Sequence, residues 1–364
     1  MPNDRVENSR EVWADDSTTL FASRVWFDRW FEAFRPAEHG EWPPLERPSP
    51  YRIAYQIESR RIGPFRLRTV SGAVNAYTPQ FDVLGTGAPS LANLRRMLKD
   101  LDASVLVLPL VARNSRLVRA LDSPRTGTGT FLDDCESAPL IDCTGSFDAY
   151  LSTRRASRRA EWLEKSERLA KAGGRLEVLS SWENVSGIFE ELLEVESSGW
   201  KGRKGTSIRQ APQARTFFGA VCRDLAAAGK LRVFVLRRDA RIVAFKIATL
   251  HAGRLSSLKT GYLEEFAKSS PGAVLQLWVS RWCFEQSGVE VFDFLGPATP
   301  TKLLWATRVE ELYTLYVFRP TPAGALAWFR WSAGPRARQW LRRLKFGRAS
   351  AAEVSKLREQ VSHA

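Results

Sequence analysis

The hydrophobic pattern of residues 1–145 alternates between strand-like and helix-like periods. Runs with strand-like character cover residues 51–59, 65–72, 75–85 and 104–112. Apolar residues at helical spacing are found at 23–34, 91–102 and 114–122. A turn-rich stretch at 126–145 has room for one strand. Alternation of strands with helices predicts an α/β layered domain.

The pattern after residue 145 predicts longer helices and a compact series of strands. One long helix is predicted from Ser146 to the Gly173–Gly174 pair, which is a typical helix end. Further helices are predicted over 183–200, 211–229 and 270–288. Strands are predicted at 175–180, within 231–265, at 289–297 and at 311–320. After the long helix, the order of elements is therefore β-α-α-β-β-β-α-β-β.

The charge of the chain indicates anionic partners. Its 364 residues carry a formal net charge of +14. A surface this basic attracts nucleic acid, acidic lipid or phosphate-bearing small molecules, and charge alone does not choose among them. The stretch 321–364 interleaves Trp, Phe and Leu with Arg and Lys, a composition typical of a helix at a membrane surface. Peripheral contact of this tail with an anionic membrane is therefore one hypothesis.

The sequence shows no targeting or membrane-spanning segment. The N-terminus lacks the apolar core of a secretory signal. The longest apolar run, residues 105–111, is too short to span a bilayer and contains Pro109. We therefore expect a cytoplasmic protein, whose basic tail offers a point of contact with the inner membrane face.

Several common motifs are excluded by residue supply or spacing. The four cysteines form no CxxC pair, so neither a zinc knuckle nor a disulfide framework is indicated. Three histidines are too few for a His-rich metal site, and no G-x-S-x-G elbow accompanies His251. The segment ESSGWKGRKGTSI at 196–208 is rich in Gly and Lys, but it lacks the G-x-x-x-x-G-K-[ST] spacing of a phosphate-binding loop. We expect no metal.

An ordered set of segments in the second half resembles a known superfamily. The segments are ESSGWKGRKGTSI, TFFGAV, AAAGKLRVFVL, KTGYLEEFAKSSPGAVLQLWV and GVEVFDFLGPATPTKLLWA. Together with the order of elements, they resemble the CelD-like branch of the GNAT superfamily, which is related to the FemAB peptidyltransferases. The resemblance covers residues 146–318 and is weaker over 1–145. It implies an α+β fold of tandem GNAT-like domains, each a mixed, mostly antiparallel sheet flanked by helices.

The resemblance also implies a division of the chain and a reaction. A degenerate N-terminal GNAT-like domain is expected at 1–145, a GNAT acyltransferase domain at 146–320, and a basic amphipathic tail at 321–364. The implied activity is transfer of an acetyl or other acyl group from acyl-CoA to an amine or hydroxyl. The family is tied to exopolysaccharide and cell-envelope work, so an amino sugar, a lipid-linked glycan and a small biosynthetic molecule are the acceptors to consider.

A helix start at residues 268–273 is the predicted site for the pyrophosphate of CoA. The first turn of a helix has unpaired N–H groups and the positive end of the dipole, which together attract anions. Pro271 fits this turn because its missing N–H costs little there, and Gly272 allows close approach of the backbone. An ordinary Ser-Pro helix start has the same local sequence, and the flanking strands favour the functional interpretation. The predicted cofactor-binding residues are Lys268, Ser269, Ser270, Gly272 and Ala273.

The resemblance implies that the strands flanking this helix splay apart and hold the thioester arm against an exposed strand edge. The acyl carbon would then lie near Lys259, Tyr262 and Asp293. Asp293 has apolar neighbours, so it is either a base with a raised pKa or a structural acid paired with Lys302 or Lys259. Tyr262 is either the acid that protonates the leaving thiolate or a core aromatic residue.

The Gly-rich bend that follows the helix at 183–200 would cover the acceptor pocket. Glu196 adjoins this bend and is a candidate base. Trp200 would form a wall of the pocket and Lys201 would contact an acidic group, unless the bend is an ordinary corner with Trp200 packed inward. The family often has a Tyr-Lys pair after its last acidic strand, whereas this chain has Thr301-Lys302, so the role of that Tyr has no counterpart. The predicted substrate-binding residues are Trp200, Lys201, Lys259 and Lys302.

Two other functions remain open. One is a Fem-type transferase that takes an aminoacyl group from tRNA, which the basic stretch 154–168 favours and the lack of a long coiled-coil arm disfavours. The other is a nonenzymatic module that binds nucleic acid or an anionic membrane surface through salt-dependent contacts. The ordered segments favour an enzyme that binds acyl-CoA, with nucleic acid as the less favoured partner.

Overall fold

The computed structural model describes residues 19–62, 64–121, 129–203, 205, 207–329 and 331. The α-helices are α2 (Arg24–Phe34), α3 (Leu91–Asp100), α4 (Arg116–Arg119), α5 (Phe147–Ser152), α6 (Ala156–Lys171), α7 (Trp182–Ser186), α8 (Phe189–Ser197), α9 (Trp200–Arg203), α10 (Pro212–Ala227), α11 (Pro271–Glu285), α12 (Pro300–Leu303) and α13 (Pro322–Trp328). Short 3-10 helices are η1 (Leu20–Ala22), η2 (Ile208–Gln210) and η3 (Glu264–Ser269).

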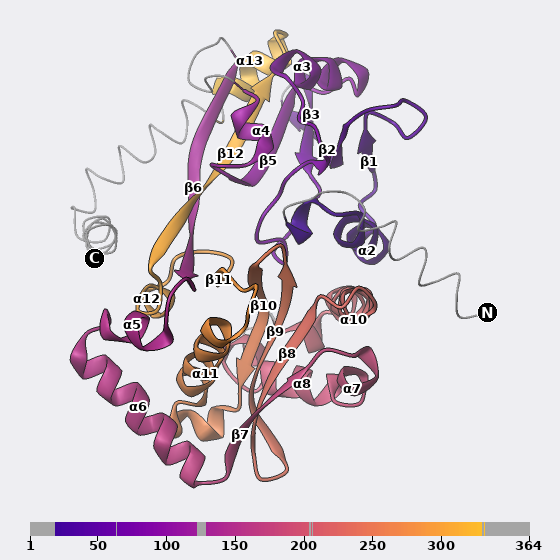
Figure 1. Cartoon of the computed structure of the whole chain (residues 1–364). Coiled ribbons are helices and arrows are strands. Elements are labelled where there is room, and N and C mark those ends of the chain that lie inside the picture. The colour runs from indigo at the N-terminus through magenta and orange to yellow at the C-terminus, as the bar shows by residue number, and fades with distance from the viewer. Residues whose placement is uncertain are drawn as a thin grey trace, which may run out of the picture.

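One mixed sheet of twelve strands runs through the described part of the chain (Figure 1). The strands are β1 (His39–Trp42), β2 (Tyr51–Ile62), β3 (Phe65–Gly72), β4 (Leu84–Gly85), β5 (Val105–Ala112), β6 (Thr130–Asp142), β7 (Gly174–Leu179), β8 (Leu231–Arg238), β9 (Arg241–His251), β10 (Arg254–Tyr262), β11 (Val291–Asp293) and β12 (Arg308–Phe318). Their order is β1-β2-β3-β5-β12-β6-β11-β10-β9-β8-β7, with β4 paired to β2. The predicted α+β class with a mixed, mostly antiparallel sheet is confirmed, since only β3–β5 and β10–β11 pair in parallel in the described residues.

The sheet contains the same unit twice. In the first half an antiparallel hairpin, β2–β3, leads through helix α3 to β5, which lies parallel to β3. In the second half the hairpin β9–β10 leads through helix α11 to β11, which lies parallel to β10. Crossover helices of this kind join parallel strands in α/β units. The repeat accounts for the tandem arrangement that the sequence predicted.

The two halves exchange the strands that follow these units. β6 comes from the first half and pairs with β11, whereas β12 comes from the end of the chain and pairs with β5. β6 and β12 also pair with each other over ten residue positions, and Figure 1 shows both running from one half to the other. The last strand of the predicted domain at 146–320 therefore lies among strands of the first half.

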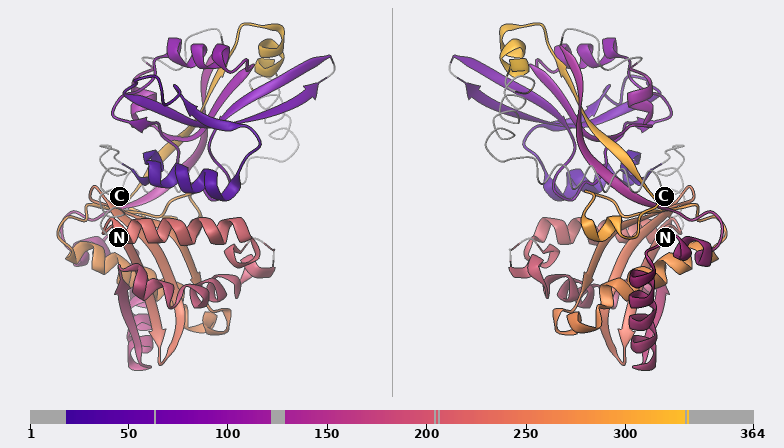
Figure 2. Two further views of the ribbon diagram at one scale, coloured as in Figure 1. Left: turned by 90° about the vertical axis from the view of Figure 1, so that its right-hand side faces the viewer. Right: turned by 90° about the vertical axis from the view of Figure 1, so that its left-hand side faces the viewer.

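The main hydrophobic core is continuous between the halves. Helix α2 of the first half packs on α10 of the second, and Trp26 meets Phe217 edge to face at 4.9 Å. Figure 2 shows these two helices at the junction. An ion pair of 2.6 Å between Arg29 and Asp224 ties them together at the surface. A second core lies on the opposite face of β8–β10, under α5, α6 and α11.

Several predicted elements have different bounds in the structure. The single helix predicted from Ser146 is interrupted between α5 and α6, where Tyr150 and Arg154 bond the carbonyl oxygens of Trp305 and Ala306. The helix predicted over 183–200 is likewise divided, with Gly187 between α7 and α8.

Strand predictions also failed in two places. Most of 75–85 is irregular, because Asn75 starts a turn by accepting a hydrogen bond from the Tyr77 N–H at 2.9 Å, and only β4 remains. The strand predicted at 289–297 is limited to the three residues of β11. The one strand expected within the turn-rich stretch 126–145 is confirmed: it is β6, at the centre of the sheet.

Candidate active site at the junction of the halves

Strands β10 and β11 pair over a short segment only, at the place where the family resemblance implies that they separate. They pair in parallel for three residues, ending at Ser256 and Asp293. β10 then continues to Tyr262, and its register with β9 shifts between Ser257 and Lys259, which indicates a bulge. In the described part of the chain, no strand pairs with the β11-facing edge of β10 beyond Ser256. Such an edge presents backbone N–H and C=O groups to an extended ligand.

The N-terminus of α11 lies beside the end of β10. Its N-cap residue, Ser270, has a left-handed backbone with φ of 51°, and its side chain makes no capping hydrogen bond. Pro271 occupies the first position and Gly272 the second. An ideal Cβ on Gly272 would be 3.4 Å from Cδ1 of Tyr262, so this ring borders the helix start. Lys268 is exposed just before it. The predicted cofactor residues and Tyr262 are thus neighbours.

The acidic residues near this helix start are already neutralised. In η3, Glu264 pairs with Arg203 of α9, and Glu265 pairs with Arg241 at 2.7 Å. The local field at the start of α11 is therefore set by the helix dipole and Lys268, both of which favour an anion.

Asp293 is the centre of a closed polar network. Its carboxylate is fully buried and accepts a 2.8 Å hydrogen bond from Nη1 of Arg254 and a 3.5 Å bond from Nε2 of Gln80. Its other oxygen accepts the Leu295 N–H at 2.8 Å. Arg254 also pairs with Glu310 at 3.2 Å. Burial raises the pKa of Asp293, and the charge of Arg254 opposes that rise.

Lys302 holds the turn that follows β11. Its Nζ donates to the carbonyl oxygen of Leu295 at 2.5 Å and to that of Pro297 at 3.1 Å. Burial lowers the pKa of Lys302, while Asp293 opposes that shift. The cation that pairs with Asp293 is nevertheless Arg254, rather than the Lys302 or Lys259 that the sequence suggested.

Glu196 of α8 and Lys259 of β10 both lie near Tyr77. Glu196 is 4% exposed, and its Oε2 accepts the N–H of Ile208 at 2.9 Å. Nζ of Lys259 lies 4.8 Å from the ring centre of Tyr77 and 4.7 Å from that of Phe218. Burial raises the pKa of Tyr77, and the negative charge of Glu196 adds to the rise. A carboxylate, an ammonium group and two aromatic rings therefore share one site between the halves.

Close packing at Gly261 fixes the position of Glu196. An ideal Cβ on Gly261 would come within 2.9 Å of Cα of Glu196 and 2.8 Å of the Phe245 ring. Only glycine allows α8 to end this close to β10.

A comparison with known protein families identifies the class of protein to which this part of the chain belongs. Residues 156–303 match the family described as Acetyltransferase (GNAT) domain. This segment is a GNAT acyltransferase domain. The GNAT domain contains both splayed strands, α11 and the bend after α8, so the chain carries a transferase of the acyltransferase class.

Known structures share the fold over most of the chain. A conserved protein of unknown function from Bacteroides thetaiotaomicron has a TM-score of 0.56 at 10% identity, covering 86% of this chain and 97% of its own. FemX has a TM-score of 0.51 at 12% identity, covering 88% and 97%. L-PGS from Bacillus licheniformis has a TM-score of 0.50 at 13% identity, covering 87% and 91%. No curated protein matches the chain significantly.

The bend after α8 contacts the end of β10 in the GNAT domain. Oγ of Ser198 donates to the carbonyl oxygen of Tyr262 at 3.0 Å and accepts the Glu264 N–H at 3.1 Å. The backbones of Trp200 and Lys201 begin α9, but their side chains lie outside the described residues. The bend is thus tied to the end of β10, and the predicted roles of Trp200 and Lys201 stay predictions.

The sequence interpretation missed three polar groups of the site. Lys246 is 4% exposed, donates to Oγ of Ser257 at 3.1 Å and lies 5.4 Å from the Phe292 ring centre. A single lysine inside the apolar run VAFKIAT was the available signal, since a lysine is almost never fully buried without a partner. Arg254 and Gln80 had no such signal, because their partners are distant in sequence. Among the described residues, no group of His, Cys, Asp or Glu is arranged to hold a metal.

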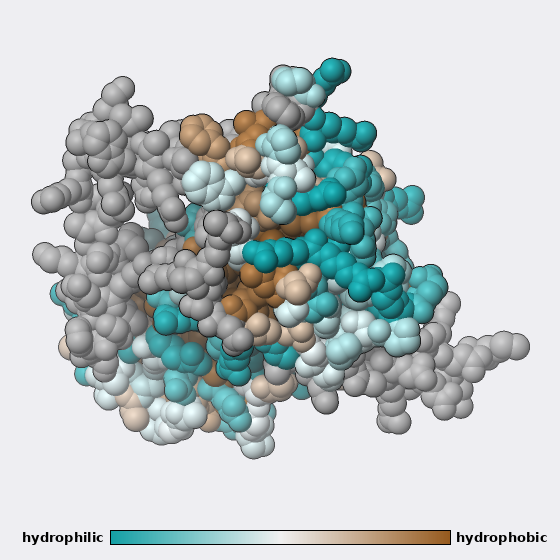
Figure 3. Space-filling model, turned by 90° about the horizontal axis from the view of Figure 1, so that it is seen from above, coloured by the Kyte–Doolittle hydropathy of each residue, from teal (hydrophilic) through white to brown (hydrophobic). Residues whose placement is uncertain are grey.

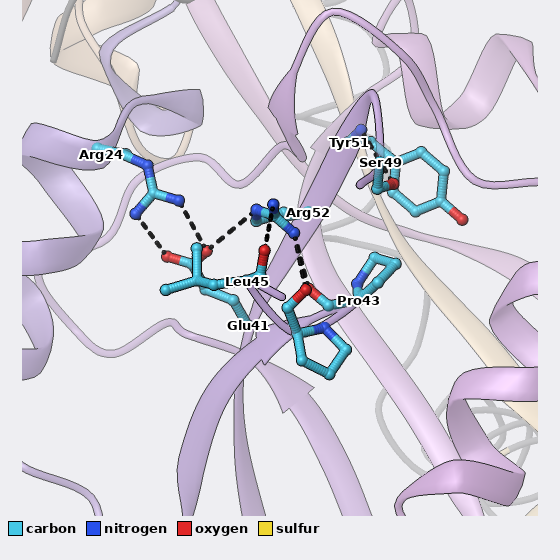
Figure 4. A network of polar contacts seen from close by, with 8 residues as sticks. Arg24, Glu41, Pro43, Leu45, Ser49, Tyr51 and Arg52 are labelled. Atoms are coloured by element: carbon cyan, nitrogen blue, oxygen red, sulfur yellow. Dashed lines mark hydrogen bonds and ion pairs between the residues drawn. The ribbon is translucent and has the colours of Figure 1, made fainter. Parts of the chain in front are cut away.

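The first half also contains a polar network, next to a cavity of about 300 Å³. Glu41 bridges Arg24 at 3.1 Å and Arg52 at 3.8 Å, and Arg52 donates to the carbonyl oxygens of Pro43 and Leu45 (Figure 4). All of these guanidinium contacts are within the protein. The network therefore holds the Pro-rich loop in place.

Proposed function

We propose that the protein is an acyl-CoA-dependent N- or O-acyltransferase. The observation that carries this proposal is the open edge of β10, which ends beside an uncapped helix start at Ser270. An extended thioester arm fits such an edge by strand addition, and a pyrophosphate fits the helix start. The group that CoA supplies is the activated acyl carbon.

Residues of this chain would hold the donor at both ends. The backbone around Ser270, Gly272 and Ala273 would bind the pyrophosphate, with Lys268 and Ser269 at its edge. Lys246 and Ser257, at the point where β10 leaves β11, would supply hydrogen-bond donors close to the reacting end of the arm. Donors aimed at developing negative charge accelerate acyl transfer.

We assign the acceptor side to the cluster around Glu196. Glu196 would accept the proton of the attacking amine or hydroxyl, since Asp293 is enclosed by Arg254 and Gln80. Tyr262, at the surface beside Gly272, would donate a proton to the leaving thiolate. Lys259 would contact the acceptor, together with Trp200 and Lys201. Lys302 would act through the turn that it holds.

A Fem-type aminoacyl transferase is the second candidate, because FemX and L-PGS share the fold. The basic helix α6 gives it less support than its composition suggested. Four of its cations pair with glutamates one turn away: Arg158, Lys165, Arg168 and Lys171. Much of the positive charge of α6 is thus compensated locally, which weakens attraction to an RNA backbone.

The location and the acceptor remain part of the proposal. We place the reaction in the cytoplasm, with an amino sugar, a lipid-linked glycan or a small molecule as acceptor. None of the described helices combines the length and the hydropathy that a bilayer-spanning segment needs. Trp328 and Phe329 are exposed at the end of α13, and apolar residues gather on that end of the molecule in Figure 3. They support a membrane contact through the tail, most of which, 332–364, lies outside the described residues.

Calorimetric titration with acetyl-CoA tests the proposal. Wild type should bind, and Gly272→Glu should bind at least 100-fold more weakly, because its carboxylate would repel the pyrophosphate. Ala92→Glu is the matched control, since Ala92 has the second position of α3; it should bind like wild type. Absence of binding by wild type would overturn the CoA proposal. Binding of aminoacyl-tRNA instead would support the second candidate.

A further inference from the structure

A cavity of about 250 Å³ lies where the first half meets the start of β10 and β12. Its walls include Asp82, Arg116 and Arg119 of the first half, and Arg254 and Glu310 of the second. The volume equals that of about eight water molecules at roughly 30 Å³ each, enough for a small metabolite or one end of a larger one. We propose that this cavity binds a small molecule through an oxyanion, a carboxylate or phosphate group, which contacts the guanidinium groups of Arg116 and Arg119.

The first reason for this proposal is the guanidinium group of Arg116. Its Nε and Nη2 atoms are buried and have no hydrogen-bond partner among the described residues. A guanidinium group stays charged at any physiological pH, so burying two of its nitrogens without acceptors costs free energy. Nε and Nη2 lie on one edge of the planar group, which is a geometry that grips two oxygens of a carboxylate or phosphate.

The charges around the cavity leave Arg116 and Arg119 available. Arg254 is engaged by two acids, Asp293 at 2.8 Å and Glu310 at 3.2 Å. Arg119 lines the same cavity and is exposed to solvent, so a ligand can reach it.

Asp82 is the nearby acid that could compensate Arg116. Its Oδ1 accepts the N–H of Val83 at 2.8 Å, and this hydrogen bond and the charge of Arg116 both oppose the larger effect of burial on its pKa. Burial raises the pKa of Asp82 to about 6. Asp82 therefore does not take the place of an oxyanion on the Nε–Nη2 edge of Arg116.

The cavity adjoins the candidate active site through Arg254. This residue lines the cavity and also binds Asp293, the last residue of β11 before the strands part. If the proposed acyl transfer is correct, on which this step rests, the oxyanion belongs to the acceptor. The acceptor would then be an acidic small molecule, anchored in the first half and acylated by the second.

The test is a thermal-shift titration with sulfate and, separately, with acetate, at constant ionic strength set by chloride. Sulfate stands for a phosphate group and acetate for a carboxylate. The wild-type transition should rise with one of the two anions, which identifies the preferred group. Arg116→Gln should weaken the fitted affinity at least tenfold and Arg119→Gln about threefold. Arg95→Gln, on the exposed face of α3, should leave it unchanged.

A variant that should bind anions more tightly distinguishes a change in anion binding from a change in protein stability. Asp82→Asn should tighten sulfate binding at pH 7.5, because Asp82 is the one acid among the described lining residues that Arg254 does not already engage. The other charged groups that line the cavity are Arg116, Arg119, Arg254 and Glu310. Sulfate keeps its charge between pH 5.5 and 7.5, so its wild-type affinity should rise several-fold at pH 5.5, where Asp82 is mostly protonated. In Asp82→Asn this pH dependence should vanish.

The proposal is overturned if neither anion shifts the wild-type transition up to 50 mM, or if Arg116→Gln retains the wild-type shift. These titrations contain no acetyl-CoA. Failure of the anion site therefore leaves CoA binding intact, and failure of CoA binding leaves the anion titration unaffected, so the two proposals fail separately.

Discussion

The two halves of the molecule contain the same unit but differ in what that unit can hold. In each half a parallel strand pair of three residues flanks a crossover helix. In the first half the helix start is closed: Ser90 and Asn93 form a capping box at the start of α3. In the second half Ser270 makes no such bond, and the start of α11 is open.

The edges of the matching strands, β3 and β10, are also closed in the first half and open in the second. β3 ends one residue after its parallel pairing, at Gly72, whereas β10 continues for six residues to Tyr262. The Phe81 ring packs on Gly72, since an ideal Cβ there would be 2.9 Å from it. Two local features, a capped helix start and a filled strand edge, therefore distinguish the first half, whereas the described residues of the second half have neither at the matching positions.

The largest expected effect on stability concerns the ion pair between Arg254 and Asp293. Arg254 and Asp293 occupy the places that Thr69 and Val107 have in the first parallel pair. Arg254→Met should lower the free energy of unfolding by about 3–5 kcal/mol, because two buried acids, Asp293 and Glu310, lose their cation. Urea denaturation measures the loss.

Thr69→Met is the control for this substitution, since it places the same side chain at the matching position. It should change stability by less than about 1 kcal/mol. Equal losses in the two variants would show that strand packing, rather than the ion network, explains the difference between the halves.

An intermediate effect on stability concerns Asp82, which follows Phe81, the residue that packs on Gly72 in the first half. Its pKa is raised from 3.8 to about 6. Between pH 4 and 6 this carboxyl group is ionised in the unfolded chain but still protonated in the folded protein. The contribution of Asp82 to the free energy of unfolding is therefore greatest below pH 4 and falls as the pH rises to 6. Two pKa units correspond to about 3 kcal/mol as an upper limit.

Denaturation of Asp82→Asn across this range checks the sign. Relative to wild type, the variant should gain stability steadily from pH 4 to 6 and stay level above pH 7. A constant difference at every pH would contradict a raised pKa at Asp82.

The smallest effect compares the two helix starts directly. Ser90→Ala should cost about 1 kcal/mol, because the capping box of α3 is lost. Ser270→Ala should cost less than about 0.5 kcal/mol, since its side chain caps nothing. A similar cost at both positions would mean that the start of α11 is not open in solution.

The sequence predicted most single elements and part of the site. The helix at 270–288, the strands within 231–265 and the helix start at Ser270 follow from local periodicity and capping chemistry, and the structure contains them. It also brings Gly272 beside Tyr262, as expected from their nearness in the chain. The interruption between α5 and α6 could not be predicted, because Tyr150 and Arg154 bond a turn 150 residues away.

What the sequence determined by itself was the period of each segment, the class of the fold and the segment that carries the acyltransferase resemblance. These depend on neighbours a few positions apart, which local sterics and solvation fix. Only the tertiary structure decided that β6 pairs with β11 and β12 with β5, and that Asp293 faces Arg254. Strand exchange and buried ion pairs depend on partners that the chain brings together only when it folds.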